Sequence, residues 1–297
     1  MKPLTRFVHA ADLHISGTVP RCRLDTDWSQ TQRAMVAFLV ATANKHQCPL
    51  VLCGDIFDKP RVATECVVFT IQELRKAAHG VYLLAGNHDL LQANVETLHQ
   101  TSLGVLLEIF PHIPQIDGVQ DAQPFGLDKS TGASVLFTHQ LVFKDEKSRP
   151  PMAKGLTAAE LLDQFPGAKW IFTGDHHDYW HYVSPDGRHV VNPGSTITHN
   201  TSKIGDKGYC ALVDIEAESV QWIEIPDDPA MVSDGHLRKE EARESRIAAF
   251  LDMVKGATAT VLDFKANLDA RRQEKTVPES VNKAIGRIVV RATTEEK

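Results

Sequence analysis

The hydrophobic pattern of the chain switches between two periods. Short apolar runs that end abruptly in polar side chains predict buried strands, whereas apolar positions three and four residues apart predict amphipathic helices. Strands that alternate with helices and then follow one another predict an α/β domain in which one sheet packs on another. The expected strands are residues 6–14, 49–58, 80–89, 133–142, 169–177, 188–196, 208–216 and 219–225, and the expected helices are residues 30–46 and 63–79.

The pattern changes after residue 226, where a stretch rich in proline and acidic residues begins. Beyond it, apolar positions recur at helical spacing and one short segment alternates as a strand does. We therefore predict a large domain, residues 1–226, and a small C-terminal cap or partner-binding region, residues 227–297. The first apolar stripe is Ile247, Phe250, Leu251 and Val254, the second is Val261, Phe264 and Leu268, and the alternating segment is residues 287–293.

The composition is that of an ordinary soluble globular protein, with 42% hydrophobic and 24% charged residues. The net charge of −6 gives no overall attraction to nucleic acid, so DNA binding would depend on a local patch or on metal ions. The five cysteines contain no C-x-x-C pair and fit no closed set of disulfides, which indicates a reducing compartment. No secretory leader or membrane-length apolar run occurs, so we expect a cytoplasmic protein that is not inserted in a membrane.

Five of the expected strands end in side chains that bind divalent cations. Loops at one edge of a sheet converge, so these residues can meet although they are distant in sequence. Carboxylate, imidazole and amide groups without thiolates suit Mn²⁺, Fe²⁺, Zn²⁺ or Mg²⁺, and a carboxylate can bridge two such ions beside a phosphate. The residues are Asp12 and His14; Asp55 and Asp58; Asn87, His88 and Asp89; His139; and Asp175, His176 and His177.

The order of these motifs resembles that of the calcineurin-like metallophosphoesterase superfamily. The matching elements are D-L-H at residues 12–14, G-D-I-F-D at 54–58, G-N-H-D at 86–89, the lone His139, and a G-x-x-H element at 174–177. Within the superfamily, the surrounding sequences are most similar to SbcD-type DNA repair nuclease subunits. The resemblance implies a four-layer α/β/β/α sandwich with a small C-terminal accessory region.

The resemblance also implies a role for each motif residue. One metal ion would be held by Asp12, His14, Asp55 and His177, and a second by Asp55, Asn87, His139 and the residue at position 175. His88 would contact the scissile phosphate and protonate or stabilise the leaving oxygen, and the Asp58 carboxylate would orient the His88 imidazole. Residues 192–195 would form a loop beside the site.

The sequence departs from the family pattern at one position. Where the family has G-H-x-H, this chain has Gly174-Asp175-His176-His177. Residues at i and i+2 of an extended chain face the same side, which favours Asp175 and His177 as ligands and turns His176 away. A local bulge would instead make His176 the ligand, and a third reading is that the second metal is weak or lost. A carboxylate at position 175 favours a hard ion, so the expected cofactor is two divalent ions, with Mn²⁺ first.

These expectations describe a metal-dependent phosphodiesterase that acts on DNA as an exonuclease or endonuclease in repair or recombination. The expected partners are DNA and an SbcC-like coiled-coil ABC ATPase, with a homodimer as another use of the C-terminal region. Two alternatives stay open: an enzyme for small nucleotides, and a regulatory subunit that binds DNA or an ATPase without cutting. The sequence assigns no nucleic-acid-binding residue, although Lys144, Lys147, Arg149 and Lys154 form a basic stretch that could meet a phosphate backbone.

Overall fold

The computed structural model describes residues 5–110, 125–126, 135–201 and 204–257, together with residues 279, 281 and 283. The chain divides into two units, residues 1–234 and residues 235–297. The expected helix around residues 261–268 and the expected strand at 287–293 lie outside the described residues.

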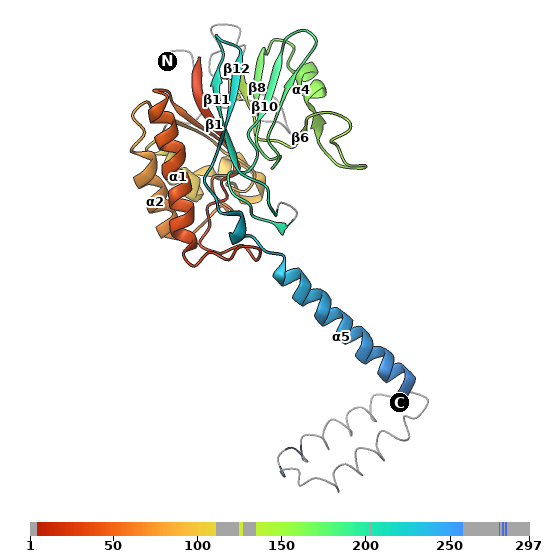
Figure 1. The fold of residues 1–297 in the computed structure, drawn as a ribbon. Helices are drawn as coiled ribbons and strands as arrows, with labels where there is room; N and C mark the ends of the chain where they lie inside the picture. Colours follow the sequence, from red (N-terminus) through yellow and green to blue (C-terminus); the bar gives the residue numbers. More distant parts are fainter. Residues whose placement is uncertain are drawn as a thin grey trace. The chain divides into compact units, whose positions relative to one another are not determined.

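The first unit contains two five-stranded sheets. One has the order β12-β11-β1-β2-β3, and its strands β1, β11 and β12 are labelled in Figure 1. The strands β1, β2 and β3 are parallel to one another. The strand β11 pairs antiparallel with β1, and β12 pairs antiparallel with β11. The strands are β1 Arg6–Ala10, β2 Leu50–Cys53, β3 Val81–Leu84, β11 Tyr209–Asp214 and β12 Ser219–Glu224.

The other sheet has the order β4-β5-β8-β10-β9. The strands β5, β8 and β10 are parallel, while β4 and β9 pair antiparallel at the two edges. The bounds are β4 Phe125–Gly126, β5 Val135–Phe137, β8 Trp170–Phe172, β9 Trp180–Val183 and β10 His189–Asn192. A separate parallel pair, β6 Val142–Phe143 and β7 Leu156–Thr157, follows β5.

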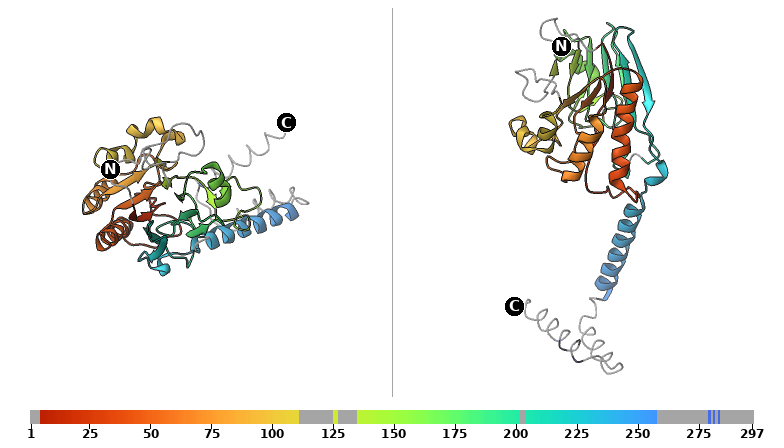
Figure 2. Two further views of the ribbon diagram at one scale, coloured as in Figure 1. Left: turned by 90° about the horizontal axis from the view of Figure 1, so that it is seen from above. Right: turned by 90° about the vertical axis from the view of Figure 1, so that its left-hand side faces the viewer.

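Helices cover the outer faces of the two sheets. The long helices α1 and α2 lie against the first sheet, and the views in Figures 1 and 2 agree on this arrangement. The short helix α4 packs beside the second sheet. The fold is therefore the α/β/β/α sandwich that the sequence predicted. The helices are α1 Trp28–Lys45, α2 Thr64–Leu74, α3 Ser102–Leu107 and α4 Ala158–Gln164, with 3₁₀ turns η1 Leu91–Ala93, η2 Val95–Gln100 and η4 Pro229–Met231.

Three hydrophobic clusters fill the spaces between the four layers. The first joins α1 and α2 to the first sheet, and the third joins α4 to the second sheet. The second lies between the sheets, where the Phe7 ring lies 5.5 Å from that of Phe137 and 4.9 Å from that of Phe172. Strands buried on both faces read as continuous apolar runs, which explains why these strands were predictable.

The helix α4 and the strand β9 are among the elements that were not predicted. The helix α4 has only seven residues, too few for a clear hydrophobic period. Its signal is a capping box, in which the Thr157 side chain accepts from the Glu160 backbone N–H and the Glu160 carboxylate accepts from the Thr157 N–H. The edge strand β9, with the sequence Trp-His-Tyr-Val, is only partly buried and has no continuous apolar run to mark it.

Residues 227–234 are fastened to the first unit by Arg23. The buried Arg23 guanidinium donates to Asp227 (Nη1–Oδ2 2.7 Å) and to Asp25 (Nε–Oδ2 2.7 Å), and it lies 5.3 Å from the Trp28 ring. Backbone bonds add to this contact, from Leu24 N–H to the Met231 carbonyl (2.8 Å) and from Ser233 N–H to the Cys22 carbonyl (2.7 Å). The stretch rich in proline and acidic residues that begins after residue 226 is thus part of the first unit up to residue 234.

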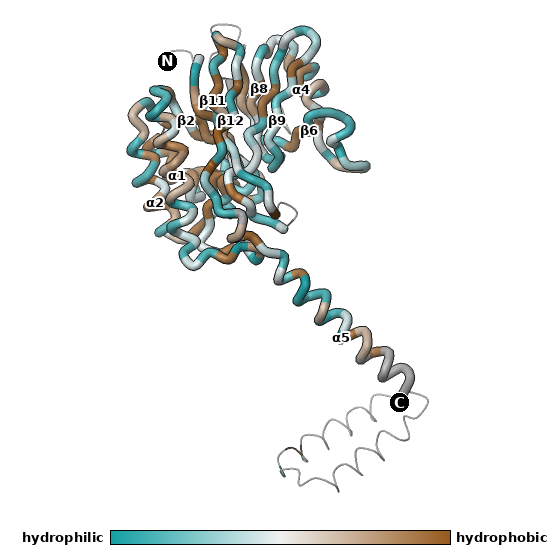
Figure 3. The backbone as a smooth tube through the Cα atoms, viewed as in Figure 1, coloured by the Kyte–Doolittle hydropathy of each residue, from teal (hydrophilic) through white to brown (hydrophobic). Residues whose placement is uncertain are grey.

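The second unit begins with α5, Gly235–Ala257. Its first part is hydrophilic and apolar residues gather further along, as Figure 3 shows. Two residues of the predicted stripe, Ile247 and Leu251, are 47% and 48% exposed. No helix in the described part of the chain is long and apolar enough to cross a membrane.

Candidate metal centre

The motif residues lie in the loops that follow five parallel strands. Asp12 follows β1, Asp55 follows β2, His88 follows β3, His139 follows β5 and Asp175 follows β8. Parallel strands deliver their carboxyl ends to one edge of a sheet, and here both sheets contribute to one cluster.

Backbone hydrogen bonds hold the first two loops against each other. The Asp12 N–H donates to the Gly54 carbonyl (3.1 Å), and the His14 N–H donates to the Asp55 carbonyl (2.9 Å). Asp12, His14 and Asp55 have φ angles of 53°, 46° and 48°, in the left-handed region that residues with a Cβ rarely adopt. Such strain is typical of functional sites that the surrounding fold holds in place.

The described residues of this cluster contain three groups of possible metal-donor atoms. Within each group, all the donor atoms lie within 4.8 Å of one another. The groups share members, so together they form one continuous set of donors. Asp12 and Asp55 are 0% and 1% exposed. The groups are Asp12, His14 and His177; Asp12, Asp55 and His139; and His14, Asp55 and His88.

The His139 imidazole is oriented by the strand beside it. Its Nδ1 lies 2.8 Å from the Cys53 carbonyl oxygen, which selects the tautomer protonated at Nδ1 when the ring is neutral. Nε2 then faces Asp55 Oδ2 at 3.2 Å, and Asp12 Oδ1 and Asp175 Oδ1, each at 3.9 Å. A histidine that donates one ring nitrogen to a carbonyl and aims the other at carboxylates has the arrangement of a metal ligand.

The donor set fits divalent cations. Both ring nitrogens of His14 and Nε2 of His139 are buried and make no hydrogen bond within the described residues. A buried imidazole nitrogen normally has a partner, and a cation between these nitrogens and the carboxylates would provide it.

The charges of the cluster depend strongly on one another. Burial raises the pKa of Asp12 to about 7. Burial also acts to raise the pKa of Asp55, but the charge of the neighbouring His139 holds it down at about 2. Burial would lower the pKa of His139, yet Asp55, Asp12 and Asp175 together raise it to about 10. In the absence of a cation, a proton on His139 therefore balances the carboxylates, and a divalent ion would displace it.

The structure separates Asp175 from His176. The Asp175 N–H donates to both carboxylate oxygens of Asp12 (3.0 and 3.1 Å), so Asp175 lies at the cluster. The His176 ring lies in the other direction, 5.2 Å from the Phe143 ring and 6.3 Å from the Trp180 ring. The backbone at Asp175 is left-handed (φ 81°), not extended as the spacing argument assumed, and this turn is what points the two side chains apart.

His88 and Asp58 meet through a different atom from the one expected. The His88 Nδ1 lies 2.9 Å from the Asp58 backbone carbonyl, while the Asp58 carboxylate Oδ1 lies 3.7 Å from His14 Nδ1. The interaction with His14 lowers the pKa of Asp58. The His88 N–H donates to Asp55 Oδ1 (2.9 Å), and Asn87 beside it is exposed. Asp58 thus contacts both histidines, and it holds His88 by its carbonyl instead of its carboxylate.

Asp89, the last residue of the G-N-H-D motif, is a buried support of the site. Its carboxylate accepts backbone N–H bonds from Gly86 (3.0 Å), Ile56 (3.2 Å) and Phe57 (2.9 Å). Burial and the Asp55 charge raise the pKa of Asp89 to about 7, while the three donors act in the opposite direction. Asp89 ties the loop after β3 to the loop after β2.

The sequence placed Asn192 in a loop beside the site without giving it a role, and it did not place His199 in the site. The Asn192 amide donates to the carbonyls of His176 (2.5 Å) and Asp178 (2.6 Å) and so fixes the loop that carries His177. The His199 ring lies 5.2 Å from that of His14, and burial lowers the pKa of His199 to about 3. The N-P-G-S motif after β10 indicated a loop here, but no sequence pattern marked His199.

Two glycines make room for the site. A Cβ on Gly54 (φ 85°) would lie 2.1 Å from His139 Nδ1, and one on Gly86 would lie 2.1 Å from Asp55 Oδ1. The glycines of the G-D and G-N-H motifs are therefore needed for the close approach of the next loop.

The basic stretch is partly neutralised within itself. Arg149 bonds Glu146 (Nη2–Oε1 2.6 Å) and Glu160 (Nη1–Oε2 3.1 Å). Ion pairing leaves Arg149 less suited to a phosphate backbone than the sequence alone indicated.

A family model described as calcineurin-like phosphoesterase matches residues 5–206, which contain every residue of the cluster. The chain belongs to the calcineurin-like phosphoesterase family. Membership supports a metal-dependent hydrolase of phosphate esters, which agrees with the donor groups around Asp55.

Two curated relatives resemble the chain at low sequence identity. The chain is 23% identical over 296 residues to the probable exonuclease subunit 1 of Escherichia phage T5, covering 94% of this chain and 86% of that protein. It is 23% identical over 229 residues to the uncharacterized metallophosphoesterase YhaO of Bacillus subtilis (strain 168), covering 68% of this chain and 56% of that one. Among solved structures, a dimetal phosphatase from Danio rerio matches with 12% identity and a TM-score of 0.42, over 71% of this chain and 93% of that chain.

Proposed function

We propose that this calcineurin-like phosphoesterase is a dinuclear-metal phosphodiesterase that cleaves DNA as an exonuclease or endonuclease. The observation that carries the proposal is the convergence of Asp12, Asp55 and His139 with His14 and His177 in overlapping donor groups. The similarity to a phage protein named as an exonuclease subunit, along nearly the whole chain, supports DNA as the substrate.

The proposal assigns two ion sites that share Asp55. One takes Asp12, His14 and His177, and the other takes His139, Asn87 and Asp175. When bound, two divalent cations neutralise the charge that develops on a phosphate and lower the pKa of water. The oxygen-rich donor set, with a carboxylate in place of an imidazole at position 175, suits hard ions, so we propose Mn²⁺.

The chain's own residues position the substrate and move the proton. In the protonated His88 ring, Nδ1–H donates to the Asp58 carbonyl (2.9 Å), which leaves Nε2–H to face the departing oxygen of the phosphodiester. The His88 backbone N–H, bonded to Asp55, keeps the ring beside the shared carboxylate. A positioned proton donor of this kind contributes about 10²–10⁴-fold to the rate.

We also propose a role in DNA repair or recombination, as the nuclease subunit of an SbcCD-like complex with a coiled-coil ABC ATPase. The exposure of Ile247 and Leu251 on α5 supports a docking surface in the second unit. Changing both to glutamate should abolish co-purification with the ATPase while leaving metal content unchanged, and Val105→Glu, at an exposed apolar residue of the first unit, is the control. Undiminished co-purification of the double variant would show that this surface is not the interface.

The deciding experiment is cleavage of end-labelled DNA by the purified chain. We expect activity with Mn²⁺, loss in excess chelator and recovery when Mn²⁺ is restored. Asp55→Asn should lose bound metal and activity, while Asp163→Asn, at an exposed aspartate of α4, should keep both. Cleavage of a chromogenic bis-phosphodiester but not of DNA would instead show an enzyme for small substrates. Full activity in metal-free protein would refute the proposal.

A further inference from the structure

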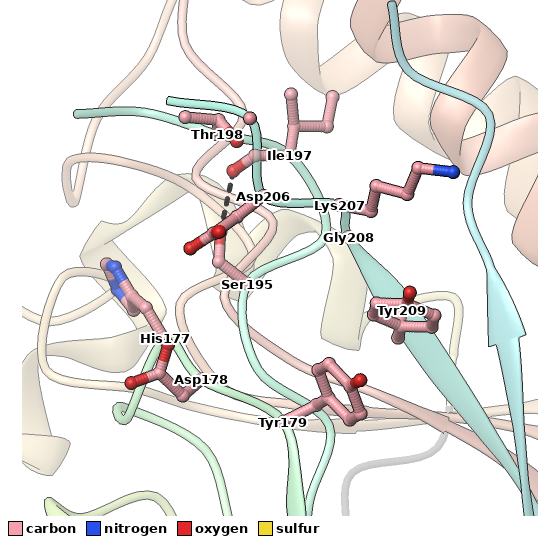
Figure 4. A pocket seen from close by; sticks show the side chains of 11 residues that line it. His177, Asp178, Tyr179, Ser195, Ile197, Thr198, Asp206, Lys207, Gly208 and Tyr209 are labelled. Carbon is pink, nitrogen blue, oxygen red and sulfur yellow. Dashed lines mark hydrogen bonds between the residues drawn. The ribbon is translucent and has the colours of Figure 1, made fainter. Parts of the chain in front are cut away.

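A pocket of about 520 Å³ opens beside the candidate metal centre (Figure 4). His177, one of the donor residues, lies on one side of it, and Tyr179 and Tyr209 lie together on another. The remaining wall comes from the loop after β10, including Ser195, and from the residues just before β11. The pocket is therefore continuous with the place where a scissile phosphate would bind.

The aromatic side of the pocket is preformed. The Tyr179 ring lies 4.2 Å from that of Tyr209 and 5.1 Å from that of Trp222, yet Tyr179 is 45% exposed. Its backbone packs closely against the adjoining loop, because a Cβ on Gly194 would lie only 2.8 Å from the Tyr179 nitrogen. A supported ring with an open surface is the usual platform for a stacked base.

The charges of the lining residues do not suit a phosphate. Two carboxylates, Asp178 and Asp206, line the pocket, and the Lys207 ammonium bonds the Glu224 carboxylate (2.6 Å). Lys207 is the one lysine or arginine among the eleven lining residues, all of which the structure describes, and its ammonium is already bonded. The pocket therefore offers a phosphate no unengaged ammonium or guanidinium group, whereas its tyrosine rings suit a neutral base. The phosphate belongs at the cluster, and the neutral part of the nucleotide belongs in the pocket.

We infer that this pocket is a nucleoside subsite, in which the base next to the scissile phosphate stacks on Tyr179. The inference rests on the proposed function and narrows its substrate. Stacking on a protein ring requires a base that has left its neighbours in the helix. The preferred substrate is then a single strand or a frayed end, and a nucleotide without a base should be a poor substrate.

The test uses dinucleotides with one phosphodiester bond, so the direction of cleavage along a strand does not enter. Three substrates are compared: one with both bases, one without the 5′ base and one without the 3′ base. Stacking contributes about 1–3 kcal/mol per base, so removal of one of the two bases should lower kcat/KM of the wild type about 5- to 150-fold. Tyr179→Ala should lower kcat/KM for the complete dinucleotide by the same factor. On the substrate that lacks the stacked base, Tyr179→Ala should cause no further loss of kcat/KM.

The controls separate stacking from a general effect on the fold. Tyr179→Phe should keep near-normal kcat/KM, and Val183→Ala, at an exposed residue of β9, should be indistinguishable from the wild type. An equal loss for Tyr179→Ala on all three substrates, or no loss at all, would overturn the subsite.

Failure of the proposed function is recognised separately. If the wild type cleaves neither DNA nor any dinucleotide with any metal, the nuclease proposal is wrong, and the subsite is judged by binding alone. Titration of the metal-free protein with 2′-deoxyadenosine should then give saturable changes in tyrosine ring resonances for the wild type and Tyr179→Phe, and none for Tyr179→Ala. Absence of binding to the wild type would overturn the subsite as well.

Discussion

Replacing Asp89 tests whether a buried carboxylate holds two loops of the metal centre together. In the wild type, Asp89 Oδ2 accepts from Gly86 N–H (3.0 Å) and Ile56 N–H (3.2 Å), and Oδ1 accepts from Phe57 N–H (2.9 Å). An asparagine has one acceptor oxygen, so Asp89→Asn keeps at most the two bonds to that oxygen and turns an amide donor toward Phe57. One orphaned buried N–H costs about 1–3 kcal/mol, and we expect this loss in the free energy of unfolding.

Asp89→Ala removes all three acceptors and should cost about 3–5 kcal/mol. The assay is urea unfolding of metal-free protein at pH 8, followed by tryptophan fluorescence. All four tryptophans lie in the first unit, so the signal reports the domain that contains Asp89. The same variants should also lose metal affinity, because the loops that carry Asp55 and His88 lose the Asp89 ties and keep those of His88 with Asp55 and Asp58.

Asp163→Asn, which removes an exposed carboxylate, is the matched control and should leave stability unchanged. A competing effect makes the outcome informative, since the Asp55 charge acts to raise the pKa of Asp89 and an uncharged asparagine relieves that repulsion. If Asp89→Asn is as stable as the wild type or more stable, charge repulsion outweighs the hydrogen bonds, and the reasoning is refuted.

Three further predictions concern residues of the candidate metal centre. Asp175→Ala should lose one metal ion per chain, whereas Asp175→His should keep both ions with a preference for softer ones. His176→Ala should also keep both ions. If metal analysis shows that His176→Ala loses an ion and Asp175→Ala keeps both, the bulged alignment is favoured. Metal binding at pH 8 should release a proton from His139, whose pKa is raised to about 10. At pH 6 it should release a second proton, from Asp12, whose pKa is raised to about 7. Because protons compete with the metal, metal affinity should fall as the pH falls. Calorimetry in buffers of different ionisation enthalpy measures this release, and identical heats in all buffers would contradict it. His88→Ala should retain metal but turn over about 10²–10⁴-fold more slowly, and an emptied metal site would show that His88 is a ligand instead.

The convergence of the motif residues could be predicted wherever a residue directly follows an apolar strand. Asp12, Asp55 and His139 each follow an apolar strand, and parallel strands bring their ends to one edge whatever the rest of the chain does. The direction of His176 was anticipated, but the reason was not, because the left-handed turn at Asp175 depends on its N–H bonding Asp12 from another sheet. The contact of Asp58 with His14 likewise depends on how two loops meet.

The sequence by itself determined the alternation of strands and helices, the order of the ligand-type residues and the family to which they belong. These are local properties, set by hydrophobic period and by residues next to one another in the chain. Only the tertiary structure decided that Asp89 braces two loops, that His199 lies against His14, that Arg23 fastens residues 227–234, and that Tyr179 and Tyr209 form one wall beside His177. Each of these contacts joins residues from separate segments, and a sequence pattern contains no information about which loops pack together until the sheets have formed.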